Sequence, residues 1–318
     1  MPAPPAVPSP APTRVAVVGA GISGAACARA LRAGGTQVTV LDRGRAVGGR
    51  MASRRLAGRP VDTGASYFTA DDPRFRAVVD DWLERGLARP WTDAFHTAGP
   101  DGLGERKQGP VRYGAPAGLR SLVQDLAAGL DVTVREVERV GPGPTVDGEA
   151  YDAVVLAMPD PQALRLLDPA LEGARTAIEG RAWDPVLSLA AGFAERTWPF
   201  DGCFVSDSAI SWVADDGRRR GDGAPVLVAH STPETARRHL ADPDAAAPEL
   251  VAALRELFAL PEPDWTYVQR WSYAKPVGTR EAPYGLAGGI GLCGDGWGAS
   301  KVQAAWLSGD ALARALAR

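Results

Sequence analysis

Cysteine is scarce in this chain, and its placement excludes two classes of protein. The 318 residues include three cysteines, Cys27, Cys203 and Cys293. They stand far apart, without a Cys-x-x-Cys pair or a histidine cluster, so neither a metal site nor a disulfide framework is indicated. Each is flanked by small or apolar residues, which predicts buried thiols. Free thiols are typical of a reducing cytosol, and we therefore expect a cytoplasmic protein without a bound metal.

Long apolar runs and a strong charge of one sign are also missing. No stretch is long and apolar enough to span a bilayer. Residues 1–13 are rich in proline and alanine, lack the features of a secretory signal, and are predicted to form a disordered tail. A net charge of −3 gives no reason to expect a nucleic-acid partner. The run Arg218-Arg219-Arg220 is interpreted as a solvated loop, with a minor role in holding substrate phosphates as the alternative.

The most specific pattern in the chain is a set of spaced glycines between two apolar segments. The apolar residues 14–18 lead into Gly19-Ala20-Gly21-Ile22-Ser23-Gly24, and a second apolar run ends in Asp42. This order is typical of a βαβ dinucleotide site, in which the glycines allow a tight turn, approach of a pyrophosphate and close helix–strand packing. The helix N-terminus offers N–H groups to the phosphates, and Asp42 can accept from a ribose hydroxyl. The alternative is a tight turn followed by an exposed aspartate.

The segment after Asp42 is too rich in glycine to be predicted as a helix. It contains Arg43 and the run Gly48-Gly49-Arg50-Met51, in which glycines permit close approach of a ligand. Its arginines offer donors to phosphate or ribose oxygens. Residues 61–68 mix small and apolar side chains, and such a segment can pass beside a large flat ligand without a clash.

Periodicity predicts two kinds of structure in the rest of the chain. Helices are expected over residues 73–87, 119–130, 248–258 and from 301 to the end. Strands that return to the nucleotide-binding sheet are expected at residues 132–134, 137 and 151–159. Short alternating runs from 186 to 273 indicate a mostly antiparallel sheet, whereas residues 91–112 show no clear periodicity.

Two further features favour FAD over NAD. The Gly48-Gly49-Arg50 run directly follows the ribose carboxylate, and residues 289–296 form a strand that ends in Gly294-Asp295 before the last helix. Asp295 can accept from a ribitol hydroxyl, and a helix N-terminus near Val302 directs its dipole at the flavin edge that gains negative charge on reduction. Alone, Gly294-Asp295 is equally well explained as a simple turn; together the three motifs predict FAD.

At these residues the chain resembles the bacterial renalase group within the flavin amine oxidase superfamily, which shares a fold with p-hydroxybenzoate hydroxylase. The similarity covers nearly the whole chain beyond the N-terminal tail. The markers are Gly48-Gly49-Arg50-Met51 and the segments at 62–70, 202–208, 270–276, 293–295 and 305–309. Two positions depart from the family pattern: Gly296-Trp297 replaces a tryptophan directly after the aspartate, and Lys301 stands where arginine is usual.

The resemblance implies an α/β protein with a Rossmann-type FAD-binding domain and a second, mostly antiparallel-sheet substrate domain. The expected FAD-binding domain is discontinuous, at 14–72, 112–165 and 285–318, and the substrate domain takes 73–111 and 166–284. The predicted FAD-binding residues are Gly19, Ala20, Gly21, Ile22, Ser23, Gly24, Asp42, Arg43, Gly49, Arg50, Met51, Val137, Gly294, Asp295 and Val302.

The resemblance also implies an activity. Non-covalent FAD would take hydride from 2- or 6-dihydro isomers of NAD(P)H, giving NAD(P)+, and O2 would then yield H2O2. Because hydride loss restores an aromatic pyridinium, this chemistry needs no general base; the protein has to stack the ring, exclude water and hold the geometry.

Aromatic side chains are the expected lining of the substrate pocket. The predicted catalytic residues are Trp297, Tyr67, His230 and Trp271, with Trp212, Tyr273 and Pro159 as further candidates. For each ring, core packing is the competing interpretation. His230 ends an apolar strand and could donate to a substrate carboxamide, but a structural histidine is the favoured interpretation. No role is assigned to Lys275.

Three other functions remain open from the sequence. A flavin amine oxidase needs an aromatic cage for a neutral amine, which these residues can also build. An FAD-dependent monooxygenase reduces its flavin with ordinary NAD(P)H, but a single dinucleotide fingerprint gives no second Rossmann domain for it. A flavin-binding protein without turnover is the last alternative. The expected partners are a small-molecule substrate and O2.

Overall fold

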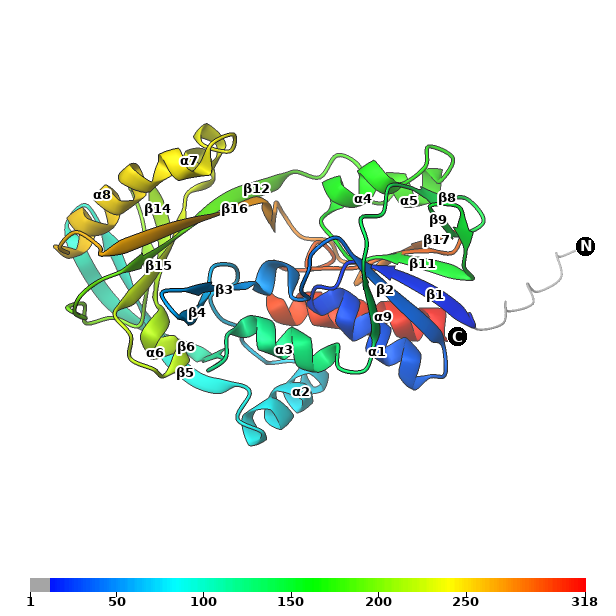
Figure 1. Ribbon diagram of the computed structural model, residues 1–318, viewed down its shortest axis with the longest axis horizontal. Helices are drawn as coiled ribbons and strands as arrows, with labels where there is room; N and C mark the ends of the chain where they lie inside the picture. The colour runs from blue at the N-terminus through cyan, green and yellow to red at the C-terminus, as the bar shows by residue number, and fades with distance from the viewer. Residues whose placement is uncertain (1–11) are drawn as a thin grey trace, which may run out of the picture. The chain divides into compact units, whose positions relative to one another are not determined.

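The computed structural model describes residues 12–318, which form two compact units (Figure 1). Unit 1 contains residues 12–47, 126–181 and 278–318, and unit 2 contains residues 48–125 and 182–277. Each unit has its own main sheet, and each is described by itself.

The sheet of unit 1 is parallel except at one edge. Its strands, in spatial order, are β17 (Gly285–Ala287), β18 (Ile290–Leu292), β11 (Ala153–Leu156), β1 (Arg14–Val18), β2 (Gln37–Asp42) and β7 (Asp131–Val134). Only the edge strand β17 runs antiparallel to its neighbour. The predicted return of the chain to this sheet is confirmed by the parallel β1–β11 and β2–β7 pairs, but Val137, predicted as a further strand position, lies outside every strand of the described residues.

Both faces of this sheet are buried, as a parallel sheet requires. On β1, Val15 and Val17 pack with α1 (Ile22–Ala33) and α9 (Val302–Leu316), while Ala16 and Val18 face a second core. Figure 1 shows α1 in blue beside α9 in red. The second core includes residues of α4 (Asp160–Leu166) and α5 (Glu172–Thr176). A small sheet completes unit 1, made of β8 (Val140–Gly141), β9 (Thr145–Val146) and β10 (Glu149–Ala150).

The main sheet of unit 2 has seven strands. In spatial order they are β16 (Trp265–Pro276), β12 (Trp183–Gly192), β15 (Val226–Ser231), β14 (Ile210–Asp215), β13 (Gly202–Val205), β5 (Arg89–Gly99) and β6 (Gly102–Gly114). Pairing is antiparallel except between β13 and β5, so the predicted mostly antiparallel sheet is confirmed. A separate hairpin joins β3 (Ser53–Leu56) to β4 (Arg59–Asp62).

The two faces of the seven-stranded sheet carry different side chains. One face packs against α7 (Pro233–Arg238) and α8 (Ala247–Phe258) in the largest apolar core (Figure 1). On the other face Trp212, His230, Ser188 and Gln269 stand opposite one another on successive strands. Cross-strand partners share a face, so this row of polar and aromatic groups lies together.

The remaining helices of unit 2 are short. They are η1 (Gly49–Met51), α2 (Pro73–Glu84), α3 (Leu119–Leu126), α6 (Asp216–Arg220) and η2 (Pro243–Ala246). Helix α2 starts where expected because Asp72 caps it, accepting from the Arg74 N–H at 2.9 Å, with Pro73 in the first turn.

Several boundaries differ from those predicted. Residues 112–125 belong to unit 2 because β6 pairs with β5, and residues 166–181 belong to unit 1, where Ala174 and Ile178 enter its core. Residues 48–72 also fall in unit 2, and residues 278–284 in unit 1. The stretch without periodicity, 91–112, is the β5–β6 hairpin, whose repeated register shifts break the alternation. A single 3-10 turn, η1, stands in the glycine-rich loop, where no helix was predicted.

The N-terminal tail is described only at its end. Residues 1–11 of the predicted disordered segment lie outside the described residues. Thr13 is hydrogen-bonded to the unit 1 sheet and to the residue that precedes β11. Its N–H donates to the Asp152 carboxylate at 2.8 Å, and its carbonyl accepts from the Gln37 N–H of β2. Within residues 12–318, no helix has both the length and the apolar character that crossing a membrane demands. The three cysteines are free and buried, as predicted.

Candidate active site

The turn from β1 into α1 has the geometry of a phosphate-binding loop. Gly19 has φ of +110°, and a Cβ there would lie 2.6 Å from the Ala157 carbonyl oxygen. A Cβ on Gly24 would lie 1.9 Å from the Gly19 carbonyl oxygen. Gly21 caps α1 without a side chain, and the first turn of the helix contains no acidic residue. The turn therefore leaves backbone N–H groups and the positive end of the helix dipole for an anion.

Asp42 stands at the end of β2, beside this turn. Its Oδ2 accepts from the Ala20 N–H at 2.6 Å, and its Oδ1 accepts from the Gly44 N–H at 2.6 Å. A carboxylate has about four acceptor positions, so two remain for ribose hydroxyls. The fixed carboxylate and the open glycine turn fit the adenosine end of a dinucleotide.

A second glycine turn follows β18. Gly294 has φ of +143°, and a Cβ there would meet no heavy atom within 4 Å, so space is open beside it. Its N–H donates to Ser308 Oγ of α9 at 3.0 Å, and the next residue, Asp295, is 7% exposed. Strands β18 and β1 are parallel and separated only by β11, so the turns that follow them both lie at the carboxyl ends of the strands, about 10 Å apart. This arrangement fits an extended dinucleotide with its ribitol near Asp295.

Trp297 packs within unit 1 beside the second turn. Its ring meets Gly285, where a Cβ would lie 2.7 Å away, and Arg280 lies 4.5 Å from its ring centre. Arg280 also pairs with Asp160 at 2.9 Å, and Arg181 donates to the Gly296 carbonyl. The indole is therefore held in a fixed orientation, with 8% of the residue exposed.

In unit 2 the Gly48-Gly49-Arg50 loop is tied to the segment formed by residues 63–68, called here the 63–68 segment. The Ala65 N–H donates to the Arg50 carbonyl at 2.8 Å, and a Cβ on Gly64 would lie 2.0 Å from that oxygen. The Arg50 guanidinium donates to the Ala274 carbonyl at 3.0 Å and lies 5.2 Å from the Trp183 ring centre. Small residues are required here because two backbones touch.

The polar face of the seven-stranded sheet holds the 63–68 segment. The Trp271 indole N–H donates to the Thr63 carbonyl at 2.7 Å, and that of Trp212 donates to Ser66 Oγ at 2.9 Å. Trp271 and Trp212 were predicted to line the pocket. Their indole N–H groups, the one donor of each side chain, are instead hydrogen-bonded to the 63–68 segment, which was not predicted. The Tyr67 ring lies 5.6 Å from that of Trp212, and burial raises the Tyr67 pKa.

His230 lies in the same row and is electrically neutral at ordinary pH. Burial first, and then the charge of Lys275, lower its pKa to about 3, although a hydrogen bond to the Gly64 backbone acts in the opposite direction. Its Nε2 has no hydrogen-bond partner among residues 12–318. The imidazole is therefore a poor base at this position.

Replacing His230 with glutamine is expected to make the stability of the protein less sensitive to acid. The folded-state pKa lies below the unfolded value of about 6.5, so this histidine stabilises the fold fully above pH 6.5 and loses that contribution as the pH falls toward 3. Between pH 7 and pH 5 the loss amounts to about 2 kcal/mol at most. Urea midpoints at both pH values measure it. Equal losses in wild type and His230→Gln would contradict the assignment; between pH 7 and pH 8 the two should change alike.

A solvated loop was predicted for residues 218–220, but Arg219 and Arg220 lie in a buried ionic cluster, and only Arg218 among the three is exposed. We call the ionic cluster the Asp216 cluster, and its members are Arg59, Asp62, Asp216, Arg219 and Arg220. Asp216 and Arg219 are fully buried. Although burial alone would raise the Asp216 pKa, Arg219 and Arg220 lower it to about 2. The acidic pair Asp215-Asp216, separated from the arginines only by Gly217, was the sequence signal for this ionic cluster.

The Asp216 cluster also reaches the candidate site. Arg219 Nη1 donates to the Ser66 carbonyl at 2.7 Å, and Asp62 Oδ1 accepts from the Leu119 N–H at 2.9 Å. The Asp216 cluster therefore ties Ser66 to Arg219 of α6, and Asp62, the residue before the 63–68 segment, to the first residue of α3. Sequence reasoning missed this role because the partners are more than 50 residues apart.

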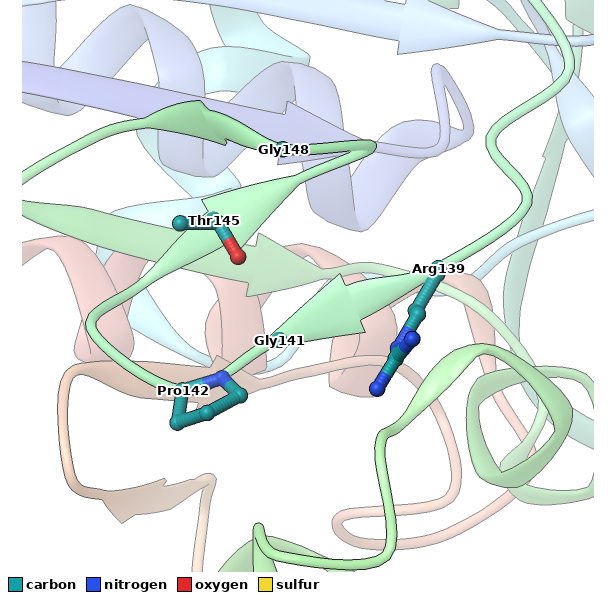
Figure 2. Close-up of a pocket in the computed structure, with 5 residues that line it drawn as sticks. All are labelled: Arg139, Gly141, Pro142, Thr145 and Gly148. Carbon is teal, nitrogen blue, oxygen red and sulfur yellow. The ribbon is translucent and has the colours of Figure 1, made fainter.

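A hollow elsewhere in unit 1 contains none of the predicted site residues (Figure 2). It measures about 240 Å³ and is lined by Arg139, Gly141, Pro142, Thr145 and Gly148. Arg139 is already paired with Asp168. We assign no ligand to it. The described residues contain no group of three His, Cys, Asp or Glu side chains placed to hold a metal ion.

Glycine turns and carboxylates at β1, β2 and β18 are the features expected of an FAD-dependent oxidoreductase. Residues 17–82 match the NAD(P)-binding Rossmann-like domain family, and residues 86–317 match the family of flavin containing amine oxidoreductases. Because the second match covers most of the chain, the protein belongs to the flavin containing amine oxidoreductase family. The predicted superfamily, fold class and FAD cofactor are confirmed.

Individual relatives give the same picture. The chain is 26% identical to renalase of Mus musculus over 298 residues, which is 83% of this chain and 85% of the mouse protein. Cyclohexylamine oxidase from Brevibacterium oxydans IH-35A matches with a TM-score of 0.77 at 14% identity, over 96% of this chain and 99% of that one. Wild-type putrescine oxidase bound to putrescine matches with a TM-score of 0.74 at 17% identity, over 95% and 98%. These two structures share the fold.

Proposed function

We propose that the protein is an oxidase of 2- and 6-dihydro isomers of NAD(P)H. The observation that carries the proposal is His230, which lies beside the 63–68 segment and whose buried Nε2 has no hydrogen-bond partner within residues 12–318. A histidine with a pKa of about 3 is a poor general base near neutral pH. Oxidation of a dihydropyridine needs no base, because loss of hydride alone restores the aromatic ring. The renalase similarity over most of the chain supports the same function.

In this proposal the side chains of the protein serve to orient the substrate. The donors of Trp271, Trp212 and Arg219 hold the 63–68 segment, which places Tyr67 and the small residues before it. In unit 1, Arg280 and Gly285 hold the Trp297 ring. In this proposal Tyr67, Trp271 and His230 shape an apolar site in unit 2 that excludes water and stacks a nicotinamide ring.

In unit 1, FAD would be held by the first glycine turn with Asp42 and by the second with Asp295, and Arg43, Val137 and Val302 belong to the same proposed set. The proposal also includes Gly49, Arg50 and Met51 of unit 2. When bound, FAD supplies a two-electron acceptor that takes the hydride, and O2 reoxidation yields H2O2. A cytoplasmic location belongs to the same proposal.

Anaerobic mixing with purified 2-, 4- and 6-dihydronicotinamide dinucleotides tests this function. We expect the 2- and 6-isomers to bleach the visible flavin band about a hundredfold faster than the 4-isomer, because only they present the donor carbon in the stacked geometry. The measurement is stopped-flow absorbance, followed by peroxide assay after oxygen is admitted. Fast bleaching by the 4-isomer alone would contradict the proposal and favour a monooxygenase.

Amine oxidation is the second candidate, favoured by the family and by the fold shared with cyclohexylamine and putrescine oxidases. Primary amines enter the same stopped-flow experiment as a separate arm. Rapid bleaching by an amine, with none by the dihydronicotinamides, would establish it. A flavin that no compound reduces would indicate a binding protein without turnover.

A further inference from the structure

Five aromatic rings gather at one end of the seven-stranded sheet in unit 2. We call them the Phe95 cluster, and they are Tyr67, Trp91, Phe95, Phe204 and Trp212. Their ring centres lie between 4.7 and 5.7 Å from that of Phe95. Tyr67 belongs to the 63–68 segment, so the Phe95 cluster continues directly from the candidate active site.

One ring of the Phe95 cluster faces outward. Phe95 and Trp212 are 2% and 5% exposed, whereas Phe204 is 50% exposed. Phe204 is backed by Trp212, with 4.8 Å between ring centres, and this support fixes its orientation. A rigid aromatic ring with one side open is the usual platform on which a planar base stacks.

Two unused hydrogen-bond donors flank the same cluster. The Arg112 guanidinium carbon lies 4.1 Å from the Phe95 ring centre. Trp91 is on the same strand as Phe95, β5, and the two ring centres are 5.3 Å apart. Arg112 Nη1 and Trp91 Nε1 are buried, and neither has a hydrogen-bond partner within residues 12–318. Buried donors without acceptors cost free energy, so this pair indicates an acceptor that binds there.

The charge at this place is positive. Lys107 stands directly opposite Phe95 in the β5–β6 pair, adding a second cation to that of Arg112. A phosphate matches two cations and an indole N–H, because it offers several acceptor oxygens and negative charge. A cationic amine does not fit this place, because the positive charges of Arg112 and Lys107 would repel it.

We infer that the Phe95 cluster binds the adenine nucleotide end of a dinucleotide substrate. Adenine stacks on Phe204, and a phosphate accepts from Arg112 and Trp91. This inference rests on the proposed function and adds to it that the enzyme prefers a dinucleotide to a mononucleotide. The nicotinamide end then lies toward Tyr67 and the 63–68 segment.

The test compares 6-dihydro-NAD with 6-dihydronicotinamide mononucleotide, which lacks the adenine end. For Phe204→Ala and Arg112→Gln we expect kcat/KM for the dinucleotide to fall about tenfold, while kcat/KM for the mononucleotide is unchanged. The Arg112→Gln variant should also lose most of the salt dependence of dinucleotide KM. FAD content and melting temperature establish that each variant is folded.

Matched controls come from the same hairpin. Leu103→Ala removes an exposed apolar side chain, and Arg106→Gln removes an exposed arginine that pairs with Asp93. Both should retain wild-type kcat/KM for both substrates. Equal losses for the two substrates in Phe204→Ala, or no preference for the dinucleotide in wild type, would overturn the inference.

Direct binding separates this inference from the proposed function. If neither nucleotide reduces the flavin, the proposed function fails, and calorimetric titration of the holoenzyme with ADP-ribose then decides about the subsite. Binding that weakens about tenfold in Phe204→Ala supports the Phe95 cluster as a nucleotide subsite. Absence of binding to wild type overturns it.

Discussion

Gly24→Ala protein is expected to be purified nearly without FAD. The added Cβ would lie 1.9 Å from the Gly19 carbonyl oxygen and 3.1 Å from the Ala157 side chain, and both neighbours belong to the packed edge of the unit 1 sheet. Helix α1 has to move away from β1 to accept the methyl group, which takes its N-terminal N–H groups away from the pyrophosphate position. We expect FAD occupancy to fall to about a tenth of wild type, with roughly 1–3 kcal/mol lost in folding free energy.

The measurement is the ratio of visible flavin absorbance to protein absorbance, together with urea unfolding in excess FAD. Gly34→Ala is the matched control at the other end of α1. Gly34 has φ of −82°, which alanine adopts readily, and a Cβ at this position would lie 3.3 Å from the nearest atom, the Leu31 carbonyl oxygen. The control should retain FAD. A yellow Gly24→Ala protein with wild-type occupancy would show that FAD does not depend on this turn.

Arg219→Ala is expected to produce the largest loss of stability among single arginine variants of unit 2. Arg219 is fully buried, donates to the Ser66 carbonyl at 2.7 Å, and balances the buried charge of Asp216. Its removal reduces the arginine partners of Asp216 in the cluster from three to two, Arg59 and Arg220, leaves a cavity in a dry environment, and cuts one support of the 63–68 segment. Breaking such a pair costs about 3–5 kcal/mol, which urea midpoints at constant FAD concentration would measure.

The adjacent residue provides the control. Arg218 is 54% exposed and pairs with Asp201 at the surface, so Arg218→Ala should cost less than about 1 kcal/mol. Arg219→Lys should recover part of the loss, because lysine keeps the charge but cannot bond Ser66 and Asp216 in the same planar geometry. Similar midpoints for the two alanine variants would contradict the role of the Asp216 cluster.

Local pattern was sufficient for the nucleotide-binding half. The segment from Arg14 to Asp42 folds as predicted, with α1 at Ile22–Ala33, because its strands, glycines and helix are consecutive in the chain. The β5–β6 hairpin was missed because register shifts disturb its alternation, although its turn, Pro100-Asp101 between Gly99 and Gly102, has a typical turn sequence. The identity of the pocket aromatics was suggested by residue type, but their hydrogen bonds were not.

By itself, the sequence determined the dinucleotide motif, the FAD cofactor, the two sheets and the burial of the three cysteines, because each depends on neighbouring residues or on side-chain type. Only the tertiary structure decided that Arg219 lies in the interior and that Trp271 and Trp212 hold the 63–68 segment. Those roles depend on partners up to 208 residues away, brought together by the strand order of a sheet. Local periodicity does not determine which distant strands become neighbours in a sheet. It therefore does not determine which buried charges pair or which buried donors form hydrogen bonds.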